Sequence, residues 1–277
     1  MFSIYNSISE KQRPLVMGIL NVTPDSFFET GKNFFAESAF NRALEIESDG
    51  ADIIDIGGCS TSPGKSFASL EEELSRLKTV LPLIPSTVKI PVSVDTFRPE
   101  VAKFALENGA TIVNDESGVF QKEMATLVKE YNSSWIFMHT GKRTSSETRE
   151  YKDGVVADVL EFFKSMKEQA LEFGISEDKL CFDYGIGFGK TREDDLTLLK
   201  NTAVFSDFKP LLVGVSNKRV VGQATGREVD DRLFGTVSAE SISAFLGAGV
   251  IRTHNVKACV DSINMVNSII KGGFING

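Results

Sequence analysis

Eight short apolar segments recur along the whole chain, and the stretches between them carry apolar residues at helical spacing. The segments are rich in Val, Ile, Leu or Phe without clean polar alternation, which is typical of strands buried on both faces of a parallel sheet. They lie at 15–20, 52–57, 90–95, 111–115, 134–139, 180–185, 211–216 and 250–254. A chain with this alternation of strand and helix is expected to fold as an α/β protein.

The intervening stretches also carry the end signals of helices. Ser69 and Glu72 have the spacing of a capping box, Pro99 suits a first helical turn, and residues 153–173 form one long amphipathic stretch. Several stretches end in glycine just before the next apolar segment, a recurrent way to leave a helix. These glycines are Gly50, Gly109, Gly174 and Gly247.

Eight strand–helix units are the number that a (β/α)8 TIM barrel needs. We therefore predict a single barrel domain over residues 1–277, with its active site at the C-terminal ends of the strands. The alternative is an open, doubly wound parallel sheet.

Composition narrows the class of partner. The net charge of −8 in 277 residues argues against nucleic acid or an anionic membrane surface. The apolar stretch 14–20 is too short to span a bilayer. Three widely spaced cysteines, Cys59, Cys181 and Cys259, do not form a zinc or disulfide pattern and are typical of a reduced cytoplasmic protein.

Polar residues gather where the apolar segments end. In a barrel all of these ends meet at one mouth. Arg252 and His254 are two residues apart on one predicted strand, so both point the same way and form an anion-binding surface. The full set comprises Asn21, Asp55, Asp95, Asn114, Asp115, His139, Asp183, Ser216, Lys218, Arg252 and His254.

Other features have plainer interpretations. The sequence GIGFGKT at 185–191 is not a P-loop, because that motif needs glycine at Tyr184, and it is not a dinucleotide fingerprint, because Lys190 replaces a glycine. His139 alone at a strand end is more often structural than catalytic. The glutamates at 71–73 are expected on a solvated helix face.

With these residues aligned, the chain resembles the dihydropteroate synthases from about Val16 to Val256. The resemblance rests on MGILNVTPDSF at 17–27, GADIIDIGG at 50–58, SVDT at 93–96, ND at 114–115, MH at 138–139, GIGFGKT at 185–191, SNK at 216–218 and RTH at 252–254. It implies a (β/α)8 barrel that condenses 6-hydroxymethyl-7,8-dihydropterin diphosphate with 4-aminobenzoate in folate biosynthesis. It also implies Mg²⁺ and a homodimer.

The resemblance assigns roles residue by residue, and the side-chain chemistry supports them. The expected catalytic residues are Asp95, Lys218 and Arg252. The expected pterin contacts are Asp95, Asn114, Met138, Asp183, Gly214 and Lys218. The expected diphosphate contacts are Asn21, Thr61, Arg252 and His254, with Asn21 as the protein ligand of Mg²⁺. The expected 4-aminobenzoate contacts are Thr61, Ser62, Phe188 and Ser216.

The chain departs from the family pattern at two arginines. Ser62 and Asn217 stand where the family usually has arginine, and each change removes a positive charge from a site that handles anions. Lys65 and Arg219 are near in sequence and are expected to compensate. Because both changed loops would contact 4-aminobenzoate and hence sulfonamides, sulfonamide affinity is expected to differ from that of typical members.

Two other functions stay open at this point. One is a methyltetrahydrofolate-dependent methyltransferase-like barrel, which shares the pterin contacts but expels no diphosphate. The other is a non-catalytic or altered-specificity pterin-binding paralogue. Lys218, Arg252 and His254 favour the synthase, because they can bind the diphosphate.

Overall fold

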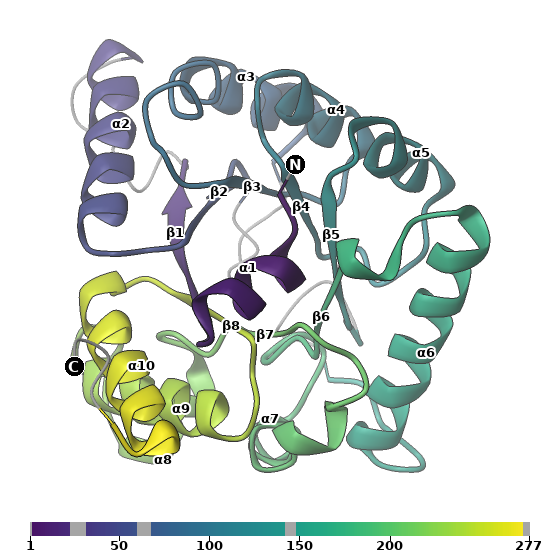
Figure 1. Ribbon diagram of the computed structural model, residues 1–277, viewed down its shortest axis with the longest axis vertical. Helices are drawn as coiled ribbons and strands as arrows, with labels where there is room; N and C mark the ends of the chain where they lie inside the picture. Colours follow the sequence, from purple (N-terminus) through teal and green to yellow (C-terminus); the bar gives the residue numbers. More distant parts are fainter. Residues whose placement is uncertain (1, 23–31, 60–67, 142–147, 274–277) are drawn as a thin grey trace.

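The strands close into a barrel in the computed structural model, which describes residues 2–22, 32–59, 68–141 and 148–273. Neighbouring strands are parallel and follow chain order around the barrel, with the eighth paired to the first. Figure 1 shows the strands at the centre and the helices around them. The predicted TIM barrel is therefore confirmed.

The strands begin and end close to the predicted apolar segments. They are β1 (Leu15–Asn21), β2 (Ile53–Gly57), β3 (Val92–Asp95), β4 (Ile112–Asp115), β5 (Ser134–Met138), β6 (Leu180–Asp183), β7 (Leu211–Val213) and β8 (Val250–Thr253). The α-helices are α1 (Ile4–Lys11), α2 (Lys32–Ser48), α3 (Leu70–Val80), α4 (Pro99–Glu107), α5 (Lys122–Tyr131), α6 (Val155–Phe173), α7 (Arg192–Lys200), α8 (Arg219–Thr225), α9 (Leu233–Phe245) and α10 (Val256–Lys271). Short 3₁₀ turns are η2 (Glu177–Lys179), η3 (Thr202–Phe205) and η4 (Val229–Asp231). Two helices, α8 and α9, follow β7 where one was expected.

The predicted helix signals act as expected. Ser69 and Glu72 form a reciprocal capping box at the start of α3, and Pro99 opens α4. The four predicted glycines all have positive φ, between 86° and 104°. Each therefore releases the chain from a helix in a conformation that glycine adopts without a steric penalty.

The prediction that residues 71–73 lie on a solvated face is wrong for Glu73. Glu73 is fully buried, pairs with Arg98 and accepts a hydrogen bond of 2.8 Å from the hydroxyl of Thr96. The reason is helical geometry, because Glu73 is four residues before the buried Leu77 and shares its face.

Alternation along the strands divides the core into two layers. One face of each strand packs against the helices, and the other points into the barrel. The interior near the N-terminal ends is apolar and is built by Leu15, Met17, Ile53, Ile112, Ile136, Cys181, Leu212 and Val250. The same parity, continued toward the C-terminal ends, turns Asp55, Asp95, Asn114 and Asp183 inward.

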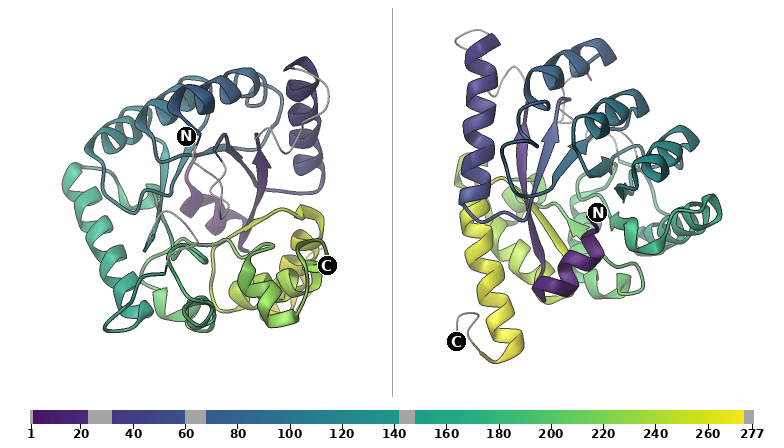
Figure 2. Two further views of the ribbon diagram at one scale, coloured as in Figure 1. Left: turned by 180° about the vertical axis from the view of Figure 1, so that it is seen from behind. Right: turned by 45° about the horizontal axis from the view of Figure 1, so that its top comes forward.

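Helix α1, which was not predicted, covers the N-terminal end of the barrel. Ile4 and Ile8 join the apolar interior cluster. The helix is tied down where Ser3 donates to the backbone oxygen of Asp178 over 2.7 Å and Lys179 donates to that of Phe2 over 2.8 Å. Figures 1 and 2 show α1 lying across this end. The C-terminal mouth is thus the end at which a ligand can enter.

Within the described residues, the helices are too short or too polar for any of them to cross a bilayer.

Candidate active site

Arg252 joins two carboxylates at the mouth of the barrel. Its Nε donates to Oδ2 of Asp55 over 2.7 Å, and its Nη2 donates to Oδ2 of Asp95 over 2.6 Å. Asn114 donates to the same Asp55 oxygen over 3.1 Å. Burial opposes the guanidinium charge, but Asp55 and Asp95 outweigh it and raise the pKa of Arg252 above its ordinary value. Three predicted site residues, Asp95, Asn114 and Arg252, are therefore in one network with Asp55.

Glu116 adds a carboxyl group that was not predicted from the sequence. It lies two residues after Asn114, on the chain that leaves the strand beside β3, and it is close enough to Asp95 to affect its pKa. Burial is the main cause that raises the pKa of both acids, and the charge of Glu116 raises that of Asp95 further. The signal that could have found Glu116 is its spacing, because residues i and i+2 leave a strand on the same side.

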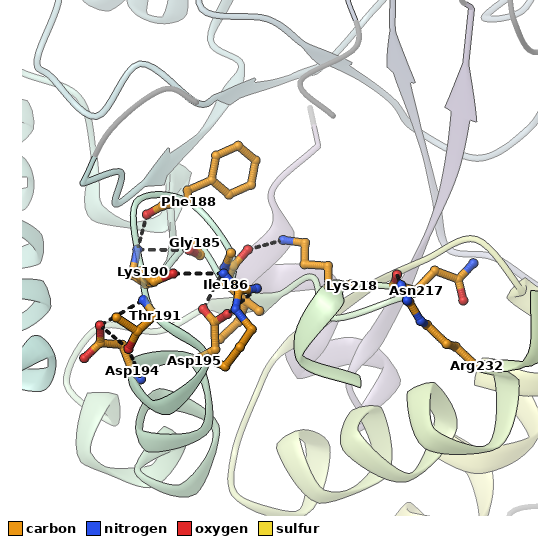
Figure 3. Close-up of polar contacts among 12 residues, drawn as sticks. Gly185, Ile186, Phe188, Lys190, Thr191, Asp194, Asp195, Asn217, Lys218 and Arg232 are labelled. Atoms are coloured by element: carbon orange, nitrogen blue, oxygen red, sulfur yellow. Dashed lines mark hydrogen bonds and ion pairs between the residues drawn. The ribbon is translucent and has the colours of Figure 1, made fainter. Parts of the chain in front are cut away.

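Lys218 supplies a second cation beside Arg252. Its Nζ donates to the backbone oxygen of Ile186 over 2.6 Å, as Figure 3 shows. The same atom lies 4.9 Å from the centre of the Phe188 ring. Burial lowers the pKa of Lys218, while the nearby Asp183 carboxylate raises it. Lys218 and Phe188, two predicted residues from different segments, thus lie close together at the mouth.

Lys190 fixes the turn that carries Ile186 and Phe188. Its buried ammonium donates to three backbone oxygens, those of His139 (3.2 Å), Gly185 (2.9 Å) and Phe188 (3.1 Å). Burial lowers the pKa of Lys190 to about 7. Gly185 has φ +64°, and a Cβ there would overlap the backbone oxygen of His139. Lys190 and Gly185 therefore position the turn (Figure 3).

Asp183 faces the same space from the end of β6. Its Oδ1 accepts a hydrogen bond of 2.7 Å from the amide of Gly185. Burial raises the pKa of Asp183, and the Lys218 charge is the largest influence that lowers it. Met138 is its register partner on β5 and is buried. A Cβ on Gly214 would lie 3.9 Å from Nζ of Lys218. The six predicted pterin contacts therefore lie around the barrel mouth.

Asn21 ends β1 with an exposed side chain. The neighbouring Gly57 has no side chain, and a Cβ there would lie 3.8 Å from Oδ1 of Asn21 and 3.6 Å from Oδ2 of Asp95. The bare backbone leaves a gap lined by oxygen atoms. Oxygen donors are the ligands that Mg²⁺ prefers, so this donor set fits the cation.

The two histidines have different surroundings. His254 contacts the hydroxyl of Ser216 through Nδ1 at 3.0 Å, and its own amide donates to the same oxygen over 3.1 Å. Although the residue is exposed, desolvation of its ring and the charges of Arg252 and Lys218 lower the pKa of His254 to about 4. His254 is thus a neutral hydrogen-bonding group at pH 7, placed beside Arg252 as predicted.

His139 is structural, as the sequence suggested. Its Nε2 lies 2.8 Å from Oδ1 of Asp158, and Arg149 donates to the other oxygen of that carboxylate over 3.0 Å. Burial lowers the pKa of His139 to about 3. The ring packs edge-on against Phe162, with centroids 5.3 Å apart. These contacts tie β5 to α6.

The remaining predicted residues belong to the two loops in which the sequence departs from the family pattern. Thr61, Ser62 and Lys65 lie outside the described residues. Asn217 has φ +59°, a conformation that asparagine tolerates better than most side chains. Its backbone oxygen accepts a hydrogen bond of 2.9 Å from Arg232 (Figure 3). Arg219 is exposed.

Comparison with known proteins agrees with this geometry. The family model described as "Pterin binding enzyme" matches residues 17–254. A dihydropteroate synthase of Bacillus subtilis is 36% identical over 275 residues, covering 98% of this chain and 94% of that protein.

Solved structures give the same result. A crystal structure of the dihydropteroate synthase from Clostridium difficile, in the presence of pteroic acid, matches with a TM-score of 0.88 and 34% identity, covering 94% of this chain and 97% of that one. The Xanthomonas albilineans dihydropteroate synthase with 4-aminobenzoic acid matches with a TM-score of 0.87 and 37% identity, covering 94% of each chain.

Proposed function

The chain belongs to the pterin binding enzyme family, where it has the function of a dihydropteroate synthase, and we propose that the charged mouth of its barrel carries out this reaction. The substrates are 6-hydroxymethyl-7,8-dihydropterin diphosphate and 4-aminobenzoate, and the products are 7,8-dihydropteroate and diphosphate. The observation that carries the assignment of the site is the convergence of two cations, Arg252 and Lys218, with Asp95 and Asp183 at one mouth.

We propose that Asp183 and Asn114 bind the edge of the pterin ring. That edge alternates donors and acceptors, and a carboxylate can accept from both an amino group and the adjacent ring N–H. Lys218 has three donors and gives one to Ile186, so it can donate another to a ring acceptor. Asp183 and Asn114 are buried and Lys218 is half-buried, so a ligand that leaves these groups without partners is costly, which favours a specific heterocycle.

The bond to the leaving group breaks before the new bond forms in the path that we propose. The C–O bond of the substrate breaks and its electron pair leaves on diphosphate. The amine of 4-aminobenzoate then attacks the cationic methylene, the C–N bond forms, and the nitrogen loses a proton. Arg252 donates to the departing diphosphate, with His254 as a neutral second donor.

Asp95 is the residue that we propose faces the positive charge. It is a carboxylate at the mouth whose side chain is 13% exposed, so ligand atoms can approach it. In a site with little water, a fixed negative charge stabilises a developing cation more strongly than it would in solvent. Arg252 holds that carboxylate in place from its other side.

We propose that Asn21 would hold Mg²⁺ through its side-chain oxygen, with diphosphate and water as the remaining ligands. A bound Mg²⁺ neutralises charge on the diphosphate. The gap beside Gly57 leaves room on the Asn21 side of the mouth. Titration of the pterin diphosphate with and without Mg²⁺ tests this, because a synthase should need the metal for binding and a methyltransferase should not.

We propose that 4-aminobenzoate lies between Phe188 and the segment after β7. Phe188 offers an aromatic face, and Ser216 offers a hydroxyl that already contacts His254. The charge of Arg219 interacts with Arg192 and Asp195, which places its guanidinium toward α7. A sulfonamide inhibition constant close to that of a typical family member would count against an altered aminobenzoate site.

We also propose that the enzyme is a homodimer. Large apolar side chains are exposed on α9 and α10, including Phe234 at 84%, Phe245 at 61% and Met265 at 62%. Phe234 and Phe245 are eleven residues apart, about three turns, so they share one face of α9. Exposed apolar patches of this kind often mark subunit contacts. Ultracentrifugation should show a dimer that Phe234→Asp weakens.

A cytoplasmic location is part of this proposal. The three cysteines have free thiols, which fits a reducing compartment. Cell fractionation of the tagged protein tests it.

Product analysis tests the proposed function. Incubation with both substrates should yield the mass of 7,8-dihydropteroate, and Asp183→Asn should weaken pterin binding. A protein that binds pterin but forms no dihydropteroate would be a non-catalytic paralogue. Methyl transfer from methyltetrahydrofolate would instead point to the methyltransferase.

A further inference from the structure

One peptide group in the turn after β6 is held from two sides. The backbone oxygen of Ile186 accepts a hydrogen bond of 2.6 Å from Nζ of Lys218. The amide of the next residue, Gly187, donates to Oδ1 of Asp195 over 2.7 Å. The C=O and N–H of a trans peptide lie in one plane and point in opposite directions. The Ile186–Gly187 peptide, the shared peptide below, therefore links an ammonium group to a carboxylate. Figure 3 shows Lys218 and Asp195 approaching Ile186 from different sides.

Asp195 reaches the shared peptide from the first turn of α7. Its side chain is fully buried, and its second oxygen, Oδ2, lies 3.1 Å from Nη1 of Arg192. Arg192 in turn donates to the backbone oxygen of Lys190 over 2.9 Å. Burial raises the pKa of Asp195, and the Gly187 amide and the Arg192 charge oppose this rise. Each oxygen of the carboxylate thus has a partner of its own, which fixes the direction of Oδ1.

The rest of the turn has a different support. Lys190 donates to the backbone oxygens of Gly185 and Phe188, which lie on either side of the shared peptide in the sequence. The two polar groups of the shared peptide are instead bonded to Lys218 and Asp195. Asp195 therefore supports the one peptide that Lys218 uses as its acceptor.

Lys218 lies along this peptide over its whole length. Gly187 has φ +83°, and a Cβ there would lie 3.7 Å from Cδ of Lys218, so the lysine stem passes over the glycine. The bond to Ile186 then sets the direction of the ammonium group. A carboxylate that accepts from the N–H of a peptide polarises it and strengthens the hydrogen bond at its C=O. The charge on Asp195 should therefore tighten the hold on Lys218.

We propose that Asp195 is a positioning residue, which holds the Ile186–Gly187 peptide in the orientation that directs the ammonium of Lys218 toward the pterin ring. This inference rests on the proposed function, in which Lys218 donates to a ring acceptor. Asp195 acts through the shared peptide and need not touch the substrate.

A double-mutant cycle on pterin affinity tests the proposal. Calorimetry measures the Kd of 6-hydroxymethyl-7,8-dihydropterin for the wild type, Asp195→Leu, Lys218→Met and the double variant. Leucine cannot accept from Gly187, so Asp195→Leu should raise Kd about tenfold. In the Lys218→Met background the same change should alter Kd by less than about twofold, because the ammonium is no longer present. An unchanged Kd in Asp195→Leu, or equal factors in both backgrounds, overturns the proposal.

The conservative variant Asp195→Asn distinguishes positioning from folding. Its amide oxygen can still accept from Gly187 without a charge, so Kd should rise only about two- to threefold, and only while Lys218 is present. This variant carries the cycle if Asp195→Leu does not fold. Glu193→Leu is the matched control, because Glu193 is an exposed acid in the same turn of α7, and it should keep Kd within about twofold. An Asp195→Asn variant as weak as Asp195→Leu contradicts the role of the acceptor oxygen.

NMR of the free enzyme tests the same link without a ligand. The sequence has two Ile–Gly peptides, at 56–57 and 186–187, so ¹³C-carbonyl isoleucine with ¹⁵N-glycine gives one signal for each. The signal of 186–187 should move in Asp195→Asn, and it should move less in the Lys218→Met background, because the two hydrogen bonds strengthen each other. The signal of 56–57 should stay in place. An equal displacement in both backgrounds contradicts the proposal. An enzyme with the expected NMR coupling that binds no pterin, or forms no dihydropteroate, would contradict only the proposed function.

Discussion

The guanidinium of Arg252 and the carboxylate of Asp95 lie 2.6 Å apart and link the last strand of the barrel to the third. The same guanidinium reaches Asp55, which is fully buried. Arg252 therefore has two functions, since it neutralises the acids of the free enzyme and is the residue proposed to meet the diphosphate.

Arg252→Lys should lower kcat/KM by about a hundredfold, because one ammonium cannot replace the two-pronged contact. Arg252→Ala should also reduce the free energy of unfolding by about 3 kcal/mol, since it leaves Asp55 buried without its charged partner. Steady-state kinetics and urea unfolding measure the two effects. Equal kinetics for Arg252→Lys and the wild type would exclude a specific contact with the diphosphate.

Gly185→Ala should remove most of the activity. The new Cβ would overlap the backbone oxygen of His139 and shift the turn that carries Phe188. Gly226→Ala is the matched control, because Gly226 has nearly the same φ, +68° against +64°, but nothing lies within 4 Å of a Cβ there. The control should lose only about 1 kcal/mol of stability from backbone strain and keep its kcat. Similar kcat values for the two variants would show that the turn tolerates displacement.

Arg98→Ala should destabilise the protein by about 3 kcal/mol, because it leaves the carboxylate of Glu73 buried and unpaired. Lys103→Ala, on α4, which follows Arg98 directly, removes an exposed pair with Glu107 and should cost less than about 0.5 kcal/mol. Urea unfolding compares the two. A small effect of Arg98→Ala would mean that water reaches Glu73 when the arginine is absent.

Glu240 should make stability depend on pH. It is fully buried in α9, and burial raises its pKa from 4.5 to about 7. The folded state therefore holds its proton more tightly, so the full contribution is present below pH 4.5 and is lost as pH rises through about 7. Its size is about 3 kcal/mol at most. The stability of the wild type relative to Glu240→Gln should fall between about pH 4.5 and pH 7 and be level at higher pH. A constant difference would contradict the shift.

Much of the fold could be predicted from local sequence patterns. Strands buried on both faces appear in the sequence as short apolar runs, and glycine after several of the helices marks the same connection repeatedly. Helix α1 escaped prediction because an eight-residue helix has a weak periodic signal of its own. Only the apolar end of the closed barrel gives Ile4 a place to be buried.

The site was predictable where strand parity alone decides which way a side chain points. Asp95 and Asn114 point into the barrel, as expected. The adjacent Asp115 points outward, and its carboxylate accepts a hydrogen bond of 3.2 Å from the indole of Trp135. Glu116 was missed because the group that it affects, Asp95, lies on another strand. The burial of Glu73 was not predicted, because three consecutive glutamates are typical of a solvated helix face and only the helical spacing shows which of them faces the core.

The most direct test is diphosphate release from 6-hydroxymethyl-7,8-dihydropterin diphosphate in the presence of Mg²⁺, with and without 4-aminobenzoate. The account predicts release that depends on 4-aminobenzoate and falls by about a hundredfold or more in Lys218→Ala and Asp95→Ala. Pterin binding without release, or release that is unchanged in both variants, would contradict the proposed active site.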